Sequence, residues 1–429
     1  MDATISRKWT MKKQVMPVTT DLYPRAIKNR LQTALTDTPV VCLLGPRQSG
    51  KTTLARSLTP DRAYFTLDDS AICQLANDDP AGFVQSLPAQ VTLDEVQRAP
   101  SLLIAIKSAV DQQRTPGRFL LTGSANLLLL PKIQDSLAGR MEVLHLHPLS
   151  MAELHRMPPT FLTTLLEGRF SIQIAESNPD APALAELLCK GGYPEPVQRT
   201  LVRARQWHRQ YVNAIIQRDV HDIANINDED TMSRLIELLA YRTASLLNVN
   251  SLAQDLGVQR ETTEKYLSIL ERLFLIRRLP AWHRNHAKRL IKSPKIHIVD
   301  SGLAATLSKL TPTEWLTQST AFGHLLESFV LQQISCQASA LDDELRLAHY
   351  RDKDQVEVDI VIERGREVWG VEVKKAATVD TQKDGAGLKR LAERAGKDFR
   401  GGVLLYGGSH VLPIGTKNCF ACPTNLLWR

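Results

Sequence analysis

One run of eight residues constrains the fold of this 429-residue chain more than any other: Gly45-Pro46-Arg47-Gln48-Ser49-Gly50-Lys51-Thr52. It follows the short apolar run of residues 39–44, which is typical of a buried parallel strand, and it precedes a helical pattern over residues 53–58. The run matches G-x-x-x-x-G-K-[ST] in the strand–loop–helix order that this pattern requires. It therefore predicts a P-loop within an α/β domain.

The spacing of this loop follows from the chemistry of phosphate binding. Two glycines let the backbone curl until its N–H groups point at phosphate oxygens. The helix N-terminus adds partial positive charge, Lys51 is expected to reach the β- and γ-phosphates, and the Thr52 hydroxyl is expected to bind Mg²⁺. ATP and Mg²⁺ are thus the predicted cofactors. The predicted nucleotide-binding residues are Gly45, Pro46, Arg47, Gln48, Ser49, Gly50, Lys51, Thr52 and Thr53.

Asp94 and Glu95 follow a second predicted strand, residues 91–93. In P-loop hydrolases the first carboxylate holds Mg²⁺ and a following glutamate polarises the attacking water. An Asp-Glu pair is also common in solvated turns, but this pair follows a strand that we expect to be buried. We therefore predict Asp94 as a magnesium ligand beside Thr52, and Glu95 as a catalytic residue beside Lys51.

Two more residues are candidates for the catalytic site. Ser124 follows the strand of residues 118–122, which we expect between the first two strands. Its hydroxyl could hydrogen-bond the γ-phosphate or the water, with Asn126 as the second choice and a simple turn as the alternative. Arg140 ends a helical pattern and could reach the γ-phosphate of a neighbouring subunit in a homo-oligomer. It could equally pair with a local carboxylate.

Residues 21–160 resemble the bacterial and archaeal AAA-type ATPase family in which a Walker domain precedes a C-terminal domain of unknown function. The resemblance implies an ATPase and leaves its cellular process open. It extends over most of the chain. The matching segments are residues 22–25, 43–55, 65–69, 92–100, 120–130, 136–140, 147–150, 191–194 and 217–220.

Residues 161–240 are predicted to form a helical linker that carries a basic stripe. Four arginines lie at helical spacing, so parts of one helix face would be basic. Nucleic acid or an acidic partner surface could bind there, and the alternative is a solvated face with intramolecular ion pairs. The stripe and its interleaved aromatic residues are Arg199, Arg203, Arg205, Trp207, His208, Arg209 and Tyr211.

Residues 241–310 predict a winged-helix domain. A helix capped at Asn250 or Ser251 is expected to end at Gly257, and a second helix is expected over residues 259–273. Two helices with glycine in the turn form a helix-turn-helix arrangement. Residues 274–282 would then begin a β-wing.

The predicted wing is strongly basic, because residues 277–295 contain seven Lys or Arg and no acid. A positive wing beside a candidate recognition helix suits non-specific contact with the DNA backbone. Three glutamates on that helix weaken it as a DNA reader, and winged helices also bind proteins. The basic residues are Arg277, Arg278, Arg284, Lys288, Arg289, Lys292 and Lys295, and the glutamates are Glu261, Glu264 and Glu271.

Residues 311–429 predict an α/β domain with the element order of the restriction-endonuclease-like, PD-(D/E)xK, fold. That order is helix, three strands, helix, strand. The family named above often carries the pattern seen here at residues 350–351, 357–359 and 372–374. The expected elements are residues 322–335, 345–351, 356–362, 368–374, 387–395 and 402–406.

The polar residues of this segment predict a nuclease-like metal site. Alternation is expected to bury Val358, Ile360 and Ile362 on one face of a strand and to present Asp359 on the other. Glu372 and Lys374 share a face of the next strand, and Glu327 lies on an apolar helix. The three acids could hold Mg²⁺ while Lys374 activates water. The alternative is the charged face of an ordinary amphipathic hairpin.

Composition limits the remaining options. Fifty-three Lys and Arg against 46 Asp and Glu leave a net charge of +7, which permits a polyanionic partner without requiring one. No run approaches the roughly 18 apolar residues of a membrane span, and the opening residues lack the apolar core of a secretory signal. We therefore expect a cytoplasmic protein with no membrane partner and a flexible N-terminus, residues 1–20.

The sequence thus predicts a magnesium-dependent ATPase that binds DNA through a winged helix and a basic stripe. Its C-terminal nuclease-like domain would bind or cleave DNA. The alternative is an ATP-switched regulatory scaffold whose C-terminal modules bind protein and whose nuclease-like site is inactive.

Overall fold

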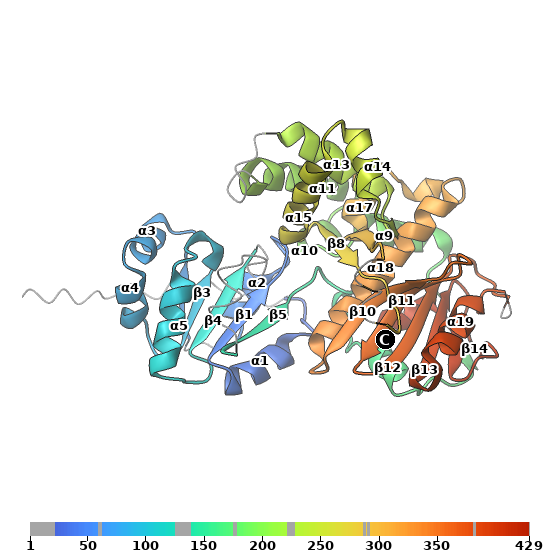
Figure 1. Cartoon of the computed structure of the whole chain (residues 1–429), viewed down its shortest axis with the longest axis horizontal. Helices are drawn as coiled ribbons and strands as arrows, with labels where there is room; N and C mark the ends of the chain where they lie inside the picture. Colours follow the sequence, from blue (N-terminus) through green and yellow to red (C-terminus); the bar gives the residue numbers. More distant parts are fainter. Residues whose placement is uncertain are drawn as a thin grey trace, which may run out of the picture.

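Figure 1 shows the fold of the chain in a computed structural model. The description covers residues 22–58, 62–124, 139–174, 178–220, 228–285, 289, 292–380 and 383–428, without the side chains of residues 219 and 220. The predicted flexible N-terminus, Asn126 and Lys288 lie outside the described residues.

The N-terminal domain is built on a parallel sheet whose described strands have the order β2-β3-β4-β1-β5. As predicted, β4 lies between β1 and β3. The strands are β1 (Val40–Leu44), β2 (Ala63–Thr66), β3 (Val91–Asp94), β4 (Phe119–Gly123) and β5 (Met141–His145). The helices are α1 (Lys28–Asp37), α2 (Lys51–Arg56), α3 (Ser70–Asp78), α4 (Pro80–Ser86), η1 (Val96–Arg98) and α5 (Leu102–Gln112).

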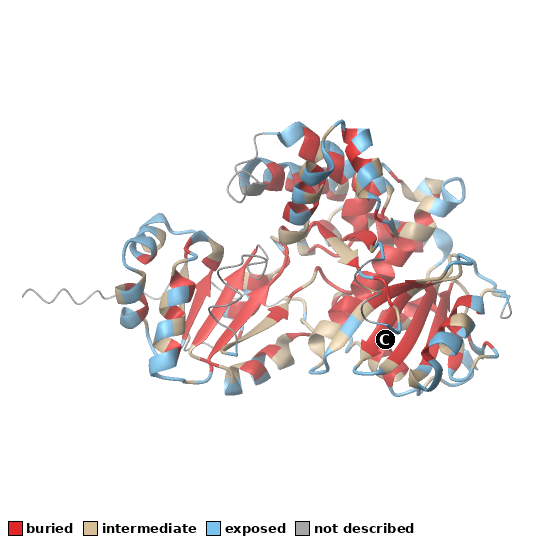
Figure 2. Cartoon of the chain, in the orientation of Figure 1, coloured by how far each residue is buried: buried red, intermediate tan, exposed pale blue. Residues whose placement is uncertain are grey.

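Both faces of this sheet are covered, which explains why β1 is apolar at every position. Val40, Cys42 and Leu44 pack into the hydrophobic cluster with α3, α4 and α5. Val41 and Leu43 pack on the other face with α1 and α2. Figure 2 shows the buried strands between helices whose outer faces are exposed. The P-loop is therefore anchored at the end of a fully buried strand.

The middle of the chain is largely helical. Its first part contains α7 (Met151–Leu154), α8 (Phe161–Leu166), β6 (Gln173–Ile174), α9 (Ala181–Lys190), α10 (Pro194–Val197), α11 (Leu201–Ile215), the π-helical turn η3 (Ile216–Val220) and α13 (Glu229–Tyr241). Its second part contains β7 (Ser245–Leu246), α14 (Val249–Leu256), α15 (Arg260–Arg272), β8 (Ile276–Leu279), β9 (Lys295–Ile298), α17 (Ser301–Leu307) and η4 (Pro312–Glu314).

The two helices predicted on either side of Gly257 are confirmed. Gly257 has a positive φ of 72° at the end of α14, as expected of a glycine that terminates a helix. The predicted cap is two or three residues too late, because Asn248 accepts the capping hydrogen bond from the Ser251 backbone N–H at 3.1 Å. Antiparallel pairing joins the three neighbouring strands in the order β7-β9-β8.

The C-terminal segment contains every predicted helix and strand, in the predicted order. Its described sheet has the order β10-β11-β12-β13-β15-β14-β6. The elements are α18 (Ser319–Ala340), β10 (Leu345–Arg351), β11 (Glu357–Arg364), β12 (Glu367–Val373), α19 (Ala386–Ala395), η5 (Gly396–Asp398), β13 (Phe399–Tyr406), β14 (His410–Pro413), β15 (Cys419–Pro423) and η6 (Thr424–Trp428).

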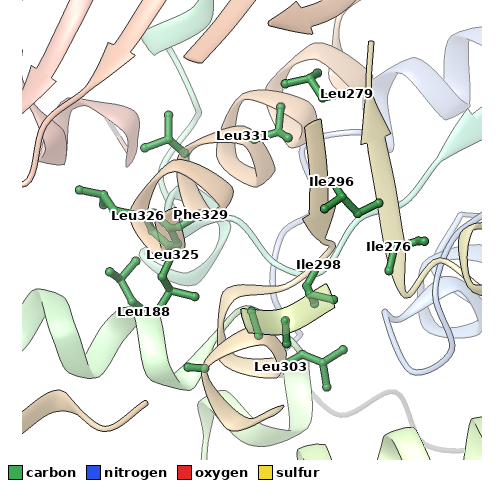
Figure 3. Packing of buried hydrophobic residues seen from close by; sticks show 14 of the residues in the cluster. Leu188, Ile276, Leu279, Ile296, Ile298, Leu303, Leu325, Leu326, Phe329 and Leu331 are labelled. Atoms are coloured by element: carbon green, nitrogen blue, oxygen red, sulfur yellow. The ribbon is translucent and has the colours of Figure 1, made fainter. Parts of the chain in front are cut away.

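One hydrophobic cluster joins the middle and C-terminal segments. Leu188 of α9, Leu303 of α17, Leu326 of α18 and Ile296 of β9 all belong to it (Figure 3). β6, which lies within the predicted linker of residues 161–240, pairs with β14 of the C-terminal sheet. That segment therefore packs as part of a shared core. None of the described helices is long and apolar enough to cross a membrane.

Candidate functional site

The P-loop has the backbone conformation that its glycines predict. Gly50 has a φ of 97°, and Gln48 also lies in the left-handed region with a φ of 58°. A Cβ atom at Gly45 would lie 2.1 Å from the Leu146 carbonyl oxygen, so only glycine fits where the loop leaves β1. The loop thus needs glycine at one position for conformation and at another for space.

Lys51 is folded back over the loop. Its side chain is 4% exposed, and its Nζ donates to the carbonyl oxygens of Gly45 at 2.9 Å and Pro46 at 2.8 Å. Burial lowers the pKa of Lys51 to about 8, although Glu95 and Asp94 partly oppose that shift. The ammonium group is thus desolvated and held by loop carbonyls at the place where the sequence predicts the phosphates.

The two predicted magnesium ligands contact each other. The Thr52 hydroxyl donates to Asp94 Oδ2 at 2.9 Å, and Asp94 is buried. The hydroxyls of Tyr64 and Thr122 also hydrogen-bond the Asp94 carboxylate. Hydroxyl and carboxylate oxygens are the donors that Mg²⁺ prefers, and it usually takes only one or two carboxylates besides phosphate and water. The residues present therefore fit the ion.

Glu95 and Ser124 also come together. The Ser124 hydroxyl donates to Glu95 Oε2 at 2.9 Å, so in this structure the serine orients the glutamate. Gln97 hydrogen-bonds both Glu95 and Ser124. Glu95 itself has a φ of 60°, a left-handed conformation that is uncommon for a residue other than glycine. The sequence reasoning did not identify Gln97, although it lies two residues beyond the Asp-Glu pair.

Arg25 is a second residue that the sequence reasoning did not assign to this site. Its guanidinium group donates to the Ser49 carbonyl oxygen and the His147 carbonyl oxygen, both at 2.6 Å, and pairs with Glu153 at 3.1 Å. It therefore ties the tip of the P-loop to the segment after β5. The only indication in the sequence was the family resemblance, because its first matching segment, residues 22–25, contains Arg25.

Arg140 lies away from the phosphate site of its own chain. Its Nε pairs with Asp111 Oδ1 at 2.5 Å. This is the second of the two predicted roles, an ion pair with a local carboxylate. It directly precedes β5, whose first residue, Met141, is paired with Val40 at the start of β1. The P-loop follows the other end of β1, so Arg140 lies at the opposite edge of the sheet. Its role in a neighbouring subunit stays a prediction.

Much of the basic stripe, which begins just before α11 and continues along it, is engaged within the chain. Arg199 pairs with Glu195, and Arg205 hydrogen-bonds the carbonyl oxygen of Leu310. The interleaved aromatic residues Trp207, His208 and Tyr211 are buried. The aromatic residues of the stripe are therefore core residues, and Arg203 and Arg209 are its exposed arginines.

The predicted wing is less positive than its composition suggests. Arg277 is half-buried and donates a hydrogen bond to the Ser335 hydroxyl. Arg278 pairs with Glu264 at 2.6 Å and Glu271 at 3.3 Å, and Arg289 forms two hydrogen bonds with Glu363. The sequence could not show this, because those acids lie outside the 277–295 segment. Of the seven basic residues, Arg284 and Lys292 are exposed among those that the structure describes.

Two of the three predicted metal ligands, Glu327 and Asp359, contact Lys295 instead, together with Glu357. Lys295 Nζ lies 2.8 Å from Glu327 Oε1, 3.4 Å from Asp359 Oδ1 and 3.5 Å from Glu357 Oε2. Burial by itself would lower the pKa of Lys295, but Glu327 and Asp359 outweigh it and raise the pKa above its usual value. Burial also raises the pKa of Glu327, and Asp359 adds to that shift.

Glu372 points to a different partner. Its Oε1 accepts a hydrogen bond from the Leu388 backbone N–H at 2.7 Å, near the start of α19. Burial, followed by the charge of Asp359, raises the pKa of Glu372 to about 8. Lys374 is half-buried nearby and opposes that rise. Within the described ranges, no three His, Cys, Asp or Glu side chains are arranged to hold a metal ion.

A β-bulge explains where Asp359 lies. The predicted alternation is wrong at Val358, which packs with α19, whereas Ile360 and Ile362 pack with α18. The register between β10 and β11 shifts at this point, since Ala348 pairs with Val361 and Tyr350 with Val358. The extra residue re-aims the side chains of the bulged strand, and Asp359 reaches Lys295 as a result.

Comparisons with known proteins match three parts of the chain. Family models match residues 37–155 as an AAA domain, and residues 181–314 and 322–427 as domains of unknown function, DUF8612 and DUF4143. The chain is 30% identical over 398 residues to the uncharacterized proteins Rv2008c of Mycobacterium tuberculosis and Mb2031c of Mycobacterium bovis, covering 90% of this chain and 80% of each relative. A solved structure, the Walker-type ATPase PABY2304 of Pyrococcus abyssi, is 16% identical, with a TM-score of 0.43 over 67% of this chain and 96% of that one. The chain belongs to the same family as Rv2008c, and its N-terminal part is an AAA-type P-loop domain.

Proposed function

We propose that the protein is a magnesium-dependent ATPase. One observation carries this proposal: at one edge of the sheet, Lys51 lies with the Thr52–Asp94 pair and the Glu95–Ser124 pair. In this reading Lys51 binds the β- and γ-phosphates, and Thr52 and Asp94 hold Mg²⁺. Glu95 accepts a proton from the attacking water while Ser124 orients its carboxylate.

The direct test is phosphate release from ATP by the full-length chain. Release should require Mg²⁺ and stop when EDTA is added in excess. If the chain binds a fluorescent ATP analogue but releases no phosphate, the proposed nucleotide site stands and the proposed hydrolysis is wrong. If the chain has no affinity for the analogue, both the nucleotide site and the hydrolysis are contradicted.

Affinity for ATP is expected to fall as the pH rises above about 8. Burial lowers the pKa of Lys51 to about 8 in the nucleotide-free protein, and a bound triphosphate should raise it by adding negative charge nearby. Below pH 8 the lysine is protonated in both states. Above pH 8 binding must take up a proton, so the Kd should rise by up to roughly tenfold per pH unit. Fluorescence titrations from pH 7 to pH 10 measure this.

Lys51→Arg is the matched control, because a guanidinium group stays charged over this range. Its Kd should change little with pH, whatever its absolute value. A wild-type Kd that is equally constant would show that Lys51 is fully protonated throughout and would contradict the expectation.

DNA binding is a second proposed activity, and the order of elements in the middle segment favours it. A helix, a strand, two helices joined at Gly257 and two further strands follow one another, which is the order of a winged helix. Four exposed basic residues lie on α15 and beside the sheet. They are Arg260, Lys265, Arg284 and Lys292. They would contact phosphates rather than base edges.

Arg284→Glu combined with Lys292→Glu is expected to weaken DNA binding and flatten its salt dependence. Loss of two phosphate contacts should reduce the slope of log K against log salt by roughly 2. The control is Lys107→Glu with Arg114→Glu, which makes the same change in net charge on the N-terminal domain, away from the basic stripe and the wing. An equal loss of DNA affinity in both double variants would point to total charge rather than to a site. An unchanged salt slope in the Arg284→Glu, Lys292→Glu variant would contradict the proposed interface.

The competing proposal is an ATP-switched scaffold whose C-terminal modules bind protein. Its support is the ion pairing of Arg278 and Arg289, which lowers the free positive charge of the wing. Duplex DNA added to the ATPase assay separates the two proposals. Stimulated phosphate release and a gel shift at low salt favour the DNA-dependent ATPase, and the absence of both favours the scaffold.

For the C-terminal domain we propose a restriction-endonuclease-like fold that binds DNA, on the evidence of its element order. Cleavage has weaker support, because Glu372 bonds α19 while Glu327 and Asp359 bond Lys295. Cleavage would be recognised by its dependence on Mg²⁺ or Mn²⁺ and by its loss in Asp359→Ala and Glu372→Ala. Cleavage that persists in both variants would belong to another site.

A further inference from the structure

Lys295 is buried at a junction of three elements that are far apart in the sequence. It extends from β9, its first partner Glu327 lies on α18, and Glu357 and Asp359 lie on β11. The Lys295 side chain is 3% exposed and that of Glu327 is 8% exposed. A lysine is almost never buried to this extent without paired acids.

The backbone of β9 determines where Lys295 points. Successive residues of a strand alternate between its faces. Ile296 and Ile298 pack in the shared hydrophobic core (Figure 3). Lys295 and His297 take the alternate positions, and both reach α18: Lys295 bonds Glu327, and His297 Nδ1 lies 2.9 Å from the Ser328 hydroxyl oxygen. The ammonium group is therefore placed by a buried strand.

The chain just before β9 is also docked on the C-terminal sheet. The backbone N–H of Trp282 donates to the His349 carbonyl oxygen at 2.6 Å, and that of His349 donates to the Pro280 carbonyl oxygen at 2.9 Å. The Trp282 indole N–H donates to Glu363 at 2.8 Å, and Arg289 bonds the same carboxylate. These contacts hold the segment that carries Lys295 against β10 and β11.

The position of Lys295 Nζ has the contact distances of an ammonium–carboxylate cluster rather than of a metal site. The three nitrogen–oxygen distances run from 2.8 to 3.5 Å. Magnesium requires oxygens at about 2.0–2.1 Å and calcium at about 2.3–2.6 Å. Arg351 compensates one of the acids, since its Nη1 lies 2.5 Å from Glu357. Glu327 and Asp359 both contact Lys295.

We propose that the Lys295 ammonium group is the resident cation of the Glu327, Glu357 and Asp359 cluster. It takes the place of a divalent metal ion and fastens β9 to the C-terminal sheet. The cluster is then a structural clasp between the proposed winged helix and the C-terminal domain. This inference does not depend on nucleotide binding or on DNA binding.

Manganese binding by full-length protein tests the proposal without disturbing the lysine. All samples carry Asp94→Asn and contain no nucleotide, so the P-loop does not contribute. Free Mn²⁺ is then measured by electron paramagnetic resonance, with and without Asp359→Asn. The expected result is the same Mn²⁺ binding in both samples up to millimolar metal. One additional Mn²⁺ site that disappears with Asp359→Asn would overturn the proposal, because the metal would have displaced the lysine.

Stability measurements provide the second test. Lys295→Met keeps most of the side-chain volume and leaves buried carboxylates unpaired, so the unfolding equilibrium constant should rise on the order of 10²–10³-fold. Lys353→Met, on an exposed turn, is the control and should change it only a few-fold. Adding Glu327→Gln to Lys295→Met should recover at least roughly tenfold, because one unpaired buried acid is removed. Urea unfolding of Lys295→Met that matches the control would overturn the clasp.

If Lys295→Met does not fold, Glu327→Gln alone is informative. It removes the nearest negative charge and keeps the shape of the side chain, so it should also unfold more readily than Lys353→Met. Unfolding no easier than that control would contradict a clasp in which Glu327 is the closest acid.

Discussion

Replacing Glu95 by glutamine is expected to lower kcat for ATP hydrolysis by roughly 10²–10⁴-fold and to leave the Kd for ATP within a few-fold. The Glu95 carboxylate is held by the Ser124 hydroxyl and by Gln97, beside Asp94, which is the predicted magnesium ligand. Glutamine has the same shape and can still accept the Ser124 hydrogen bond, but its amide cannot take a proton from water. Binding and chemistry should therefore separate.

Two measurements check this separation: the Kd of a fluorescent ATP analogue at equilibrium and the rate of phosphate release in a single turnover. Gln97→Ala is the matched comparison, because it removes a neighbour that orients Glu95 and leaves the carboxylate in place. It should lower kcat by much less than Glu95→Gln. A Glu95→Gln chain that hydrolyses ATP at the wild-type rate would show that another group activates the water.

Replacing Lys51 by methionine is expected to raise the Kd for ATP by roughly 10²–10⁴-fold. The lysine would give the triphosphate two charge-assisted hydrogen bonds, each worth about 1.5–3 kcal/mol. Methionine keeps the apolar stem of a side chain that is only 4% exposed, so the loop should remain packed. The fold should not suffer, since the substitution removes a desolvated charge.

Lys107→Met on α5 is the control, because it removes one lysine charge from the same domain outside the P-loop. It should bind ATP as the wild type does. Urea unfolding of both variants shows whether the domain is intact. Unchanged affinity in a folded Lys51→Met chain would remove the basis for the P-loop assignment, and lost affinity in Lys107→Met would point to a general charge effect.

The pattern of neighbouring residues was sufficient to predict the strand–loop–helix order of the N-terminal domain and the residues at its strand ends. The order strand, glycine loop and helix is a property of adjacent residues, and the carboxyl ends of parallel strands necessarily meet at one edge of a sheet. Asp94, Glu95 and Ser124 were therefore placed near Lys51 by strand ends alone, and the structure brings Ser124 to Glu95. Arg25 was not predicted as part of the site, because its contact with the Ser49 carbonyl oxygen joins residues with no local relation.

The C-terminal half shows where sequence pattern stops being sufficient. The elements were predicted in the right order, since alternation and turn residues are local signals. Alternation failed at Val358, because a bulge in β11 depends on its pairing with β10 and is not visible in one strand. The basic wing was overestimated for a related reason. Glu363, which pairs with Arg289, lies 74 residues farther along the chain.

The sequence by itself determined the P-loop, the acids that follow β3 and the succession of helices and strands, because each depends on neighbours in the chain. Only the tertiary structure decided which charges face solvent and which neutralise one another. Lys295 is the clearest case. In the sequence it is one of seven basic residues within residues 277–295, a segment that contains no acid. In the folded protein it is a buried cation among three carboxylates. Charge is a property of composition, but its pairing depends on distances that only the packed chain defines.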